Sequence, residues 1–311
     1  MIQDAIGRTA TKLRLSVTDS CNFNCAYCRP QGCGSGTRQQ ALPEAEILRL
    51  ASILTAAGIQ EIRVTGGEPT LRPDLMKILQ GLSVLPLRRL AMTTNGYKLL
   101  PLLKPLLSTQ CRALNISLDS LRRERFAELT GQDAFEEVQT ALLTARDMGF
   151  SVKVNTVVLK GINHDELLDF AAFSAKNGIE VRFLEYMQID NVSFLPGNHF
   201  ITADDILALL NKEYTFSPIP VPPDSTAKRF VSLSGAKIGL ITGESQPFCR
   251  ACSRLRLSSS GVLLPCLCSD EGVILRDLPE KEVLDRVAQV FRSKPALRPQ
   301  GHFQPLYQFG G

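Results

Sequence analysis

The sequence predicts an α/β protein built on a parallel β-sheet. From residue 12 to about residue 190, six strand-like apolar runs alternate with amphipathic helical stretches. Glycine, hydroxyl and amide residues follow directly after several of these runs, where parallel α/β folds gather their functional residues. Six consecutive strand–helix units favour a sheet with helices outside it, although periodicity alone does not separate a partial barrel from an open, doubly wound sheet.

The predicted elements follow one another in a regular order. The strand-like runs cover residues 13–17, 62–65, 90–94, 113–118, 152–158 and 180–186. The main helical stretches cover residues 44–57, 74–82, 135–148 and 164–177. Asn163 is a good N-cap residue for the last of these helices.

The pattern changes near residue 220. A helix is predicted to begin at Thr202, and residues 221–227 have the composition of a loop. Short strand-like runs at 228–233 and 237–242 follow, then a group of cysteines, then a helix over 281–293. We therefore expect a core of residues 1–220 and a smaller C-terminal region of residues 221–311.

Composition restricts the class of function. The chain has 311 residues, 44% of them hydrophobic, and a formal net charge of +4, which suits a sizeable core and an anionic small-molecule substrate but not nucleic acid. Nine cysteines without an apolar leader predict a reducing compartment, the cytoplasm. No apolar run approaches the length of a membrane span.

Three cysteines follow the first predicted strand with the spacing CxxxCxxC: Cys21, Cys25 and Cys28. They cannot all pair as disulfides, and they are one ligand short of a closed tetrahedral site. An iron–sulfur cube held by three cysteines would leave one iron open to a small molecule. A zinc knuckle and unrelated buried thiols are the alternatives.

A second cysteine group has the spacing CxxCx13C: Cys249, Cys252 and Cys266. It again offers three ligands to a cube, and with Cys268 nearby a four-cysteine zinc site is the alternative. Between these cysteines, Arg254 and Arg256 alternate along a strand-like run, which places both guanidinium groups on one face. The planar guanidinium group of arginine can donate two parallel hydrogen bonds to a phosphate group.

These motifs resemble those of one enzyme superfamily and of a particular family within it. CxxxCxxC with an aromatic residue before its last cysteine, followed by Gly66-Gly67-Glu68-Pro69, resembles the signature of radical S-adenosylmethionine (SAM) enzymes. The extended motif LRLSVTDxCNxxCxYC, together with CxxCx13C enclosing RxR, resembles the GTP 3′,8-cyclase family of molybdenum cofactor biosynthesis. The similarity extends from about Leu13 to Gly310-Gly311, and no Walker A loop is present.

The resemblance implies a partial (βα)6 TIM-like barrel of the radical SAM type, with the C-terminal region covering the barrel mouth and carrying an auxiliary cluster. It implies cyclisation of GTP to 3′,8-cyclo-7,8-dihydro-GTP, with SAM and two [4Fe-4S] clusters as cofactors. The two cysteine groups would each hold one cluster. The implied partners are an electron donor and a downstream cyclic pyranopterin monophosphate synthase, and a homodimer is expected.

The resemblance also implies individual site residues. SAM would be bound by Tyr27, Gly67, Ser117 and Met187. GTP would be bound by Arg14, Arg63, Thr94, Lys153, Arg182, Arg254 and Arg256. Arg254 and Arg256 would also take part in catalysis, together with a C-terminal tail ending in Gly310 and Gly311.

The chain departs from the family pattern at three places. Glu61 stands where a second basic residue is expected, Cys268 where an aromatic is expected, and residues 188–196 differ from the usual glycine-containing stretch. The roles of Cys33 and Cys111 stay open. A radical SAM paralogue acting on another nucleotide or a peptide, and a non-catalytic zinc-binding scaffold, are the rival functions; iron and sulfide analysis and a substrate screen would separate them.

Overall fold

The computed structural model describes residues 2–28, 40–187, 195, 197–269 and 271–299. Its strands are β1 (Lys12–Ser16), β2 (Glu61–Thr65), β3 (Arg89–Thr94), β4 (Cys111–Ser117), β5 (Ser151–Val158), β6 (Glu180–Glu185), β7 (Phe216–Ile219), β8 (Lys228–Ser232), β9 (Lys237–Ile241), β10 (Arg254–Leu257), β11 (Val262–Leu264) and β12 (Val273–Ile274). Its α-helices are α1 (Glu44–Ala56), α2 (Leu75–Ser83), α3 (Leu103–Leu106), α4 (Arg123–Thr130), α5 (Phe135–Asp147), α6 (Leu167–Asn177), α7 (Ala203–Leu210) and α8 (Glu280–Arg292).

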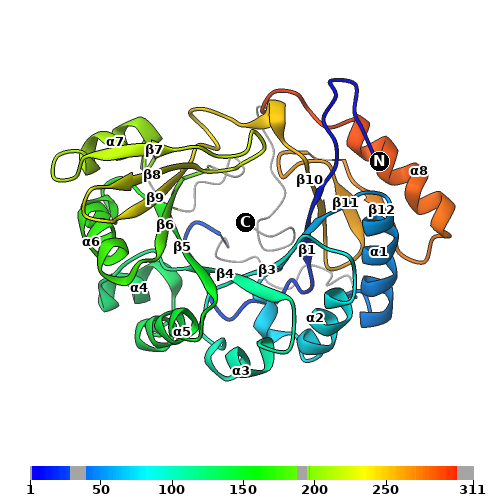
Figure 1. Cartoon of the computed structure of the whole chain (residues 1–311), viewed down its shortest axis with the longest axis horizontal. Helices are drawn as coiled ribbons and strands as arrows, with labels where there is room; N and C mark the ends of the chain where they lie inside the picture. The colour runs from blue at the N-terminus through cyan, green and yellow to red at the C-terminus, as the bar shows by residue number, and fades with distance from the viewer. Residues whose placement is uncertain (1, 29–39, 188–194, 196, 270, 300–311) are drawn as a thin grey trace.

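All of these strands form one sheet, in the order β12-β11-β10-β1-β2-β3-β4-β5-β6-β9-β8-β7. The six predicted strands are adjacent and parallel, from β1 to β6. They curve around the centre of the molecule with the helices outside (Figure 1). The sheet is open between β12 and β7, so the predicted partial barrel is confirmed.

The C-terminal region adds strands at both edges of the parallel strands β1–β6. β10 pairs in parallel with β1, and β9 pairs in parallel with β6. The remaining strands, β7, β8, β11 and β12, are antiparallel additions at the two edges. The boundary expected near residue 220 stays a prediction, since residues on both sides of it share one sheet.

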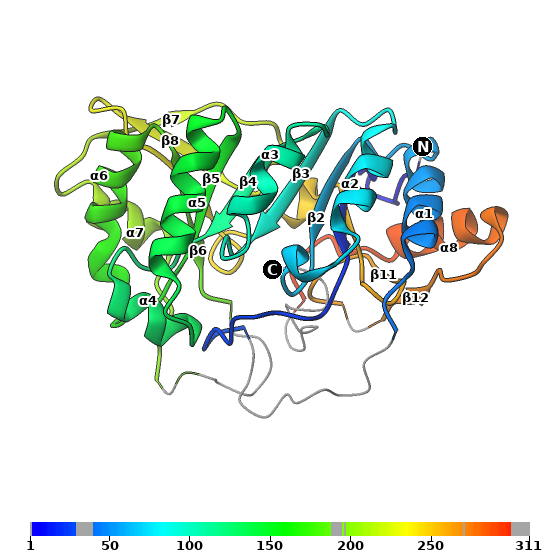
Figure 2. The ribbon, with the colours of Figure 1, turned by 90° about the horizontal axis from the view of Figure 1, so that it is seen from below.

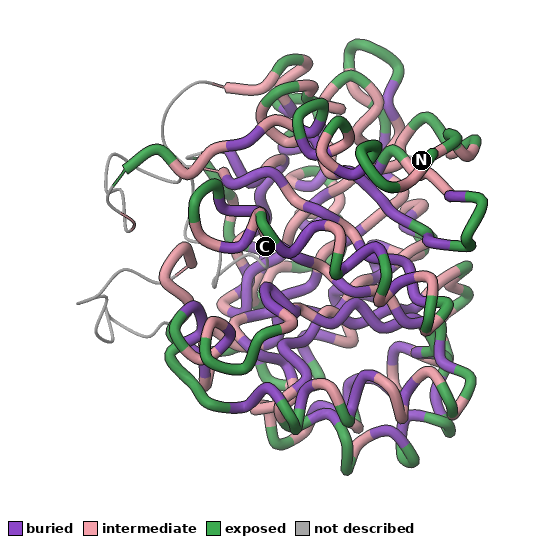
Figure 3. Tube along the Cα trace, turned by 90° about the vertical axis from the view of Figure 1, so that its left-hand side faces the viewer, coloured by how far each residue is buried: buried purple, intermediate pink, exposed green. Residues whose placement is uncertain are grey.

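Side-chain alternation separates the core from the interior of the barrel. On β1, Leu13 and Leu15 are buried in the main hydrophobic core, whereas Lys12 and Arg14 line the central cavity. The apolar side chains therefore face the helices, which lie side by side along the outside of the strands (Figure 2). Buried residues are concentrated in the inner part of the trace, and exposed residues in its outer turns (Figure 3).

Most predicted elements agree with the structure. The helix predicted to begin at Thr202 is α7, and Thr202 is its N-cap, because its hydroxyl accepts a hydrogen bond from the Asp205 amide at 3.1 Å. The prediction lacks the helices α3 and α4 and the edge strands β7, β11 and β12. No described helix has the length and apolar character required to cross a membrane.

The predicted cap at Asn163 is wrong. Its side chain makes no capping hydrogen bond, and the segment begins with a 3-10 turn, His164–Glu166, before α6. The Asn163 amide instead donates to the carbonyl oxygens of Asp119 and Val157, at 2.7 and 2.9 Å. Asn163 therefore ties the ends of β4 and β5 together.

Candidate active site

A cavity of about 960 Å³ occupies the interior of the barrel. It is lined by every predicted site residue in the described part of the chain: Arg14, Cys21, Cys25, Tyr27, Cys28, Arg63, Gly67, Thr94, Ser117, Lys153, Arg182, Met187, Cys249, Cys252, Arg254, Arg256 and Cys266. The predicted tail residues Gly310 and Gly311 lie outside the described residues, as do Cys33 and all of residues 188–196 except Leu195. Cys111, whose role was open, is buried in the main core.

The loop that carries Cys21 is fastened to the glycine turn after β2. The Gly67 amide donates to the Thr18 carbonyl at 2.7 Å, and the Glu68 amide donates to the Ser20 carbonyl at 2.8 Å. A Cβ atom at Gly67 would lie 2.4 Å from the Ser20 carbonyl oxygen. The glycine is thus required for close approach of two backbones, and its predicted contact with SAM stays a prediction.

Glu68 connects this turn to the end of β3. Its buried carboxylate accepts hydrogen bonds from the Thr94 hydroxyl at 2.7 Å and from the Asn95 amide at 2.6 Å. The Asn95 side chain donates to Asn22 at 2.9 Å, next to Cys21. Because the Thr94 hydroxyl proton is donated to Glu68, the contact of Thr94 with GTP stays a prediction.

Asp119 holds the other end of the first cysteine loop. The Tyr27 hydroxyl donates to one Asp119 carboxylate oxygen at 2.5 Å, and the Val157 amide donates to the other at 2.8 Å. Burial raises the pKa of Asp119 to about 6. Burial likewise raises the pKa of Cys25, together with the negative charges of Cys28 and Asp119. Asp119 was absent from the predicted site although it closes the segment Asn115-Ile-Ser-Leu-Asp119.

The second cysteine group lies at the opposite end of the β1–β10 strand pair. Cys252 precedes the first residue of β10, and the antiparallel strand β11 returns the chain so that Cys266 lies at the same end. Lys294 fastens this turn by donating to the carbonyl oxygens of Arg254, at 2.8 Å, and Pro265. The buried Arg8 donates to the Cys249 carbonyl at 2.7 Å.

The donor chemistry of this group suits a metal cluster. Burial opposes ionisation of Cys252, but Arg254 and Lys294 outweigh it and hold its pKa at about 6. The Cys268 backbone amide donates to the Cys266 sulfur at 3.5 Å, and the interaction between the two cysteines lowers the pKa of Cys266 and raises the pKa of Cys268. Both shifts favour the thiolate, the form of cysteine that binds metal.

Among the described residues, no three His, Cys, Asp or Glu side chains converge as ligands of a single metal ion. Three cysteines that hold an iron–sulfur cube would each bind a different iron, so they need not point at one metal ion.

Three arginines form a row across neighbouring strands, which we call the inner arginine row: Arg256, Arg14 and Arg63. Arg14 on β1 is in register with Arg256 on β10 and with Arg63 on β2. Burial, together with repulsion from neighbouring arginines, lowers the pKa of all three, to about 9 for Arg63 and about 10 for Arg256. Arg63 also donates to the Thr93 hydroxyl at 3.4 Å.

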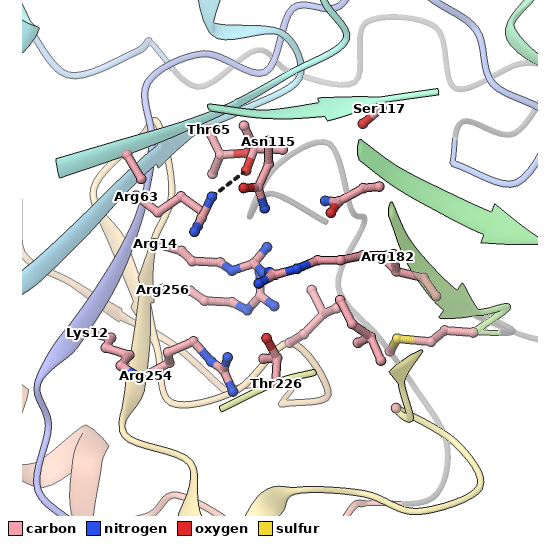
Figure 4. Close-up of a pocket in the computed structure, with 18 of the residues that line it drawn as sticks. Lys12, Arg14, Arg63, Thr65, Asn115, Ser117, Arg182, Thr226, Arg254 and Arg256 are labelled. Atoms are coloured by element: carbon pink, nitrogen blue, oxygen red, sulfur yellow. Dashed lines mark hydrogen bonds between the residues drawn. The ribbon is translucent and has the colours of Figure 1, made fainter. Parts of the chain in front are cut away.

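The facing wall carries three more cations around one carboxylate. Arg182 extends from this wall toward Arg14 and Arg256 (Figure 4). Glu180 accepts from Lys153, Arg182 and Arg229, each at 2.7 Å. Burial opposes ionisation of Glu180, but the charges of Arg182 and Lys153 hold its pKa at about 2. Glu180 and Arg229 were not in the predicted site, because their contacts join three strands.

We predict that Glu180→Ala lowers the free energy of unfolding by about 3 to 5 kcal/mol, since it leaves three partly buried cations without their carboxylate. The matched control is Glu282→Ala, which breaks the exposed Glu282–Arg286 pair on α8 and should cost less than about 1 kcal/mol. Urea unfolding measures both.

The same contact predicts a pH dependence. The pKa of Glu180 falls from an ordinary 4.5 to about 2 on folding, so its contribution is complete above about pH 4.5 and is lost as the pH falls toward 2. Equal unfolding energies for parent and Glu180→Ala at pH 7 would contradict both predictions.

Two amide side chains in the cavity were also absent from the predicted site. Asn115 on β4 and Asn155 on β5 line the cavity, and the side-chain oxygen of each is buried without a hydrogen-bond partner among the described residues. A buried acceptor without a donor is costly, so these atoms fit a ligand that brings hydroxyl or ammonium donors. Asn155 follows Lys153 on the same face of β5, which was the available signal.

Two protein-family models match the chain. The model described as "Radical SAM superfamily" matches residues 15–174, and the model described as "Molybdenum Cofactor Synthesis C" matches residues 179–304. The chain belongs to the radical SAM superfamily, a class that uses SAM and an iron–sulfur cluster. Within it, the relatives described next show that the chain belongs to the GTP 3′,8-cyclase family.

These curated relatives cover nearly the whole chain. A GTP 3′,8-cyclase of Aquifex aeolicus is 39% identical over 91% of this chain and 89% of its own length. One from Synechocystis is 37% identical over 99% of this chain and 94% of its own length. "Molybdenum cofactor biosynthesis protein 1" of Drosophila melanogaster is 35% identical over 94% of this chain and 54% of its own length.

Solved structures share the fold at low sequence identity. Streptococcus suis SuiB bound to S-adenosylmethionine has a TM-score of 0.69 and 16% identity, over 92% of this chain and 68% of SuiB. Native anSMEcpe with bound AdoMet has a TM-score of 0.60 and 15% identity, over 89% of this chain and 81% of that protein. At such identities the likeness concerns the fold alone.

Proposed function

We propose that this chain uses the barrel cavity to cyclise GTP to 3′,8-cyclo-7,8-dihydro-GTP in molybdenum cofactor biosynthesis. The observation that carries the proposal is one cavity that joins two three-cysteine groups with buried cations on both walls. Membership of the GTP 3′,8-cyclase family supports the same function. SAM and its iron–sulfur cluster, when bound, supply the one-electron chemistry that begins at the ribose of GTP.

The cysteines divide into two ligand sets. Cys21, Cys25 and Cys28 hold the cluster that binds SAM, and Cys249, Cys252 and Cys266 hold a second [4Fe-4S] cluster. The lowered pKa values of Cys252 and Cys266 support the second set. Cys268, whose backbone amide donates to the Cys266 sulfur at 3.5 Å, is not a ligand in this proposal.

The polar side chains of the cavity position the two small molecules. The inner arginine row and the facing Lys153 and Arg182 bind the triphosphate, since forks of hydrogen-bond donors match phosphate oxygens. Mutual repulsion and burial destabilise these cations until an anion enters. Asn115 and Asn155 accept hydrogen bonds from donors of the bound molecules. Fixed geometry is the protein's main contribution to such a reaction, because a reactive centre attacks whatever lies nearest.

Several parts of the proposal rest on family membership alone. They are the SAM contacts of Tyr27, Gly67, Ser117 and Met187, and the catalytic tail at Gly310 and Gly311. An electron donor, delivery of the product to a cyclic pyranopterin monophosphate synthase, and a homodimer belong to the same group. None of these is needed for the argument from the cavity.

The function is tested by a substrate screen. Anaerobically reconstituted protein is incubated with SAM, a reductant, and GTP, other nucleoside triphosphates or peptides. We expect deoxyadenosine and a cyclised nucleotide with GTP, and no comparable product with the other substrates. Turnover of a peptide or another nucleotide in preference to GTP would contradict the proposal, as would protein that binds zinc and no iron.

We predict that Arg254→Ala and Arg256→Ala each weaken GTP binding about ten- to a hundredfold, the usual effect of losing one charge-assisted contact. Iron content should not change in Arg256→Ala, because its side chain is not a cluster ligand. It should also be retained in Arg254→Ala, because Lys294 still lowers the pKa of Cys252 there. Anaerobic equilibrium dialysis measures the affinity. Arg286→Ala on the outer helix α8 is the control and should bind GTP like the parent. Unchanged affinity in both cavity variants would show that GTP does not bind at this wall of the cavity.

A further inference from the structure

Arg89, the first residue of β3, lines the cavity. Along β3, Leu90 and Met92 belong to the main hydrophobic core, whereas Arg89, Ala91 and Thr93 line the cavity. Side chains alternate between the two faces of a strand. Arg89 therefore belongs to the inner face of the wall, the face that carries the inner arginine row.

Arg89 closes a second row of charged residues, which we call the strand-start row: Arg254, Lys12, Glu61 and Arg89. Each is the first residue of its strand, on β10, β1, β2 and β3. The parallel register aligns Arg254 with Lys12, Lys12 with Glu61, and Glu61 with Arg89. The row thus crosses the four strands from the second cysteine group to Arg89.

The other members of the row already have partners. Lys12 pairs with Asp224 at 2.5 Å, and the Glu61 carboxylate pairs with Arg88. Arg254 lies over the Phe248 ring, 5.0 Å from its centre.

Arg89 differs from them. Within the described part of the chain, its guanidinium group has no hydrogen bond, ion pair or ring contact. After burial, the charge of Arg89 is the largest influence that lowers the pKa of Arg63. An uncompensated cation among other cations is favourable only when an anion joins them.

The position along the row identifies which part of the ligand reaches Arg89. Three strand spacings of about 4.8 Å separate Arg254 from Arg89, about 14 Å in all. If the purine lies at the second cysteine group beside Arg254, only the far end of the triphosphate extends to β3. Glu61 stands where a second basic residue was expected. Its carboxylate forms an ion pair with Arg88 and would repel a phosphate group.

We propose that Arg89 binds the terminal phosphate of the nucleoside triphosphate and supplies the contact that Glu61 cannot make. The inference rests on the proposed function, because it places GTP in the cavity. Arg89 is then the residue that distinguishes a triphosphate from a diphosphate in this chain.

The test compares GTP and GDP affinities of the SAM-loaded, cluster-containing enzyme under anaerobic conditions. Arg89→Ala should weaken GTP binding about ten- to a hundredfold and change GDP binding less than about twofold. Arg112→Ala is the matched control, since Arg112 is an exposed arginine near the start of the next strand and does not line the cavity. It should leave both affinities unchanged.

A second pair of variants guards against a folding defect. Arg89→Lys should retain most of the preference for GTP over GDP. Glu61→Lys added to Arg89→Ala should restore at least tenfold of the lost GTP affinity, because it places a base one strand away in the same row. Iron content and SAM affinity report whether each variant is intact.

The outcomes separate the inference from the proposed function. Equal losses for GTP and GDP in Arg89→Ala, or no loss, would overturn the role of Arg89 while leaving GTP as the substrate. Failure of Glu61→Lys to restore affinity would also count against the role. A parent enzyme that binds neither nucleotide would overturn the proposed function itself, and the inference with it.

Discussion

Replacing Cys21 with alanine is expected to abolish SAM cleavage and to lower the iron content from about eight to about four atoms per chain. A cube held by three cysteines has no spare ligand, and the loop of Cys21 is fixed by hydrogen bonds to the turn after β2, so no neighbouring side chain takes its place. Iron and sulfide analysis of anaerobic protein, together with a deoxyadenosine assay, measures the result.

Two other cysteines serve as controls for this substitution. Cys111→Ala removes a buried thiol of the core, and Cys268→Ala removes the thiol beside the ligand Cys266 but keeps the backbone amide that donates to it. Both variants should keep two clusters. Zinc at one equivalent, lost from Cys268→Ala, would instead establish a four-cysteine zinc site and contradict the two-cluster proposal.

Gly67→Ala is expected to disrupt the first cluster site as strongly as loss of a ligand. The new Cβ atom would lie 2.4 Å from the Ser20 carbonyl oxygen and 2.7 Å from that of Asp19, distances that only a backbone shift relieves. Because Cys21 follows directly, the shift moves a cluster ligand. We expect loss of about half of the iron and of all SAM cleavage, with the second cluster retained.

Gly81→Ala is the control for this steric effect. Its Cβ atom would meet only the side-chain end of Leu48, beside helix α2, which moves by rotation, and alanine favours the helix. We expect full iron content in this variant. Full iron content in Gly67→Ala would show that the contact between the two loops is dispensable.

The sequence was sufficient where a feature depends on a local pattern. The six parallel strands follow from alternating apolar runs, and the CxxxCxxC loop falls after β1 as the strand assignment required. Arg254 and Arg256 do share one face, since β10 is a regular strand. Such features can be predicted from sequence because side chains alternate between the two faces of a strand with a period of two residues.

The rest depended on partners distant in the chain. Glu180 could not be selected from sequence, because its three cations come from β5, β6 and β8. Asn163 is a residue type that often caps helices, but its side-chain amide donates to two carbonyl groups on other segments instead. The partner of Glu61 was equally hidden, since Arg88 reaches it across strands. Tertiary hydrogen bonds decide among locally similar choices.

Because β10 pairs with β1, the sheet can be completed only late in synthesis on the ribosome. Lys12 is synthesised long before its strand partner Arg254, which follows only after β9 has been made. Until then the nascent chain carries uncovered edges at both β1 and β6, and such edges invite pairing with other chains. Closing so long a loop is also slow. The newly made chain therefore displays the complete first cysteine group, on an unfinished wall, before the second group exists.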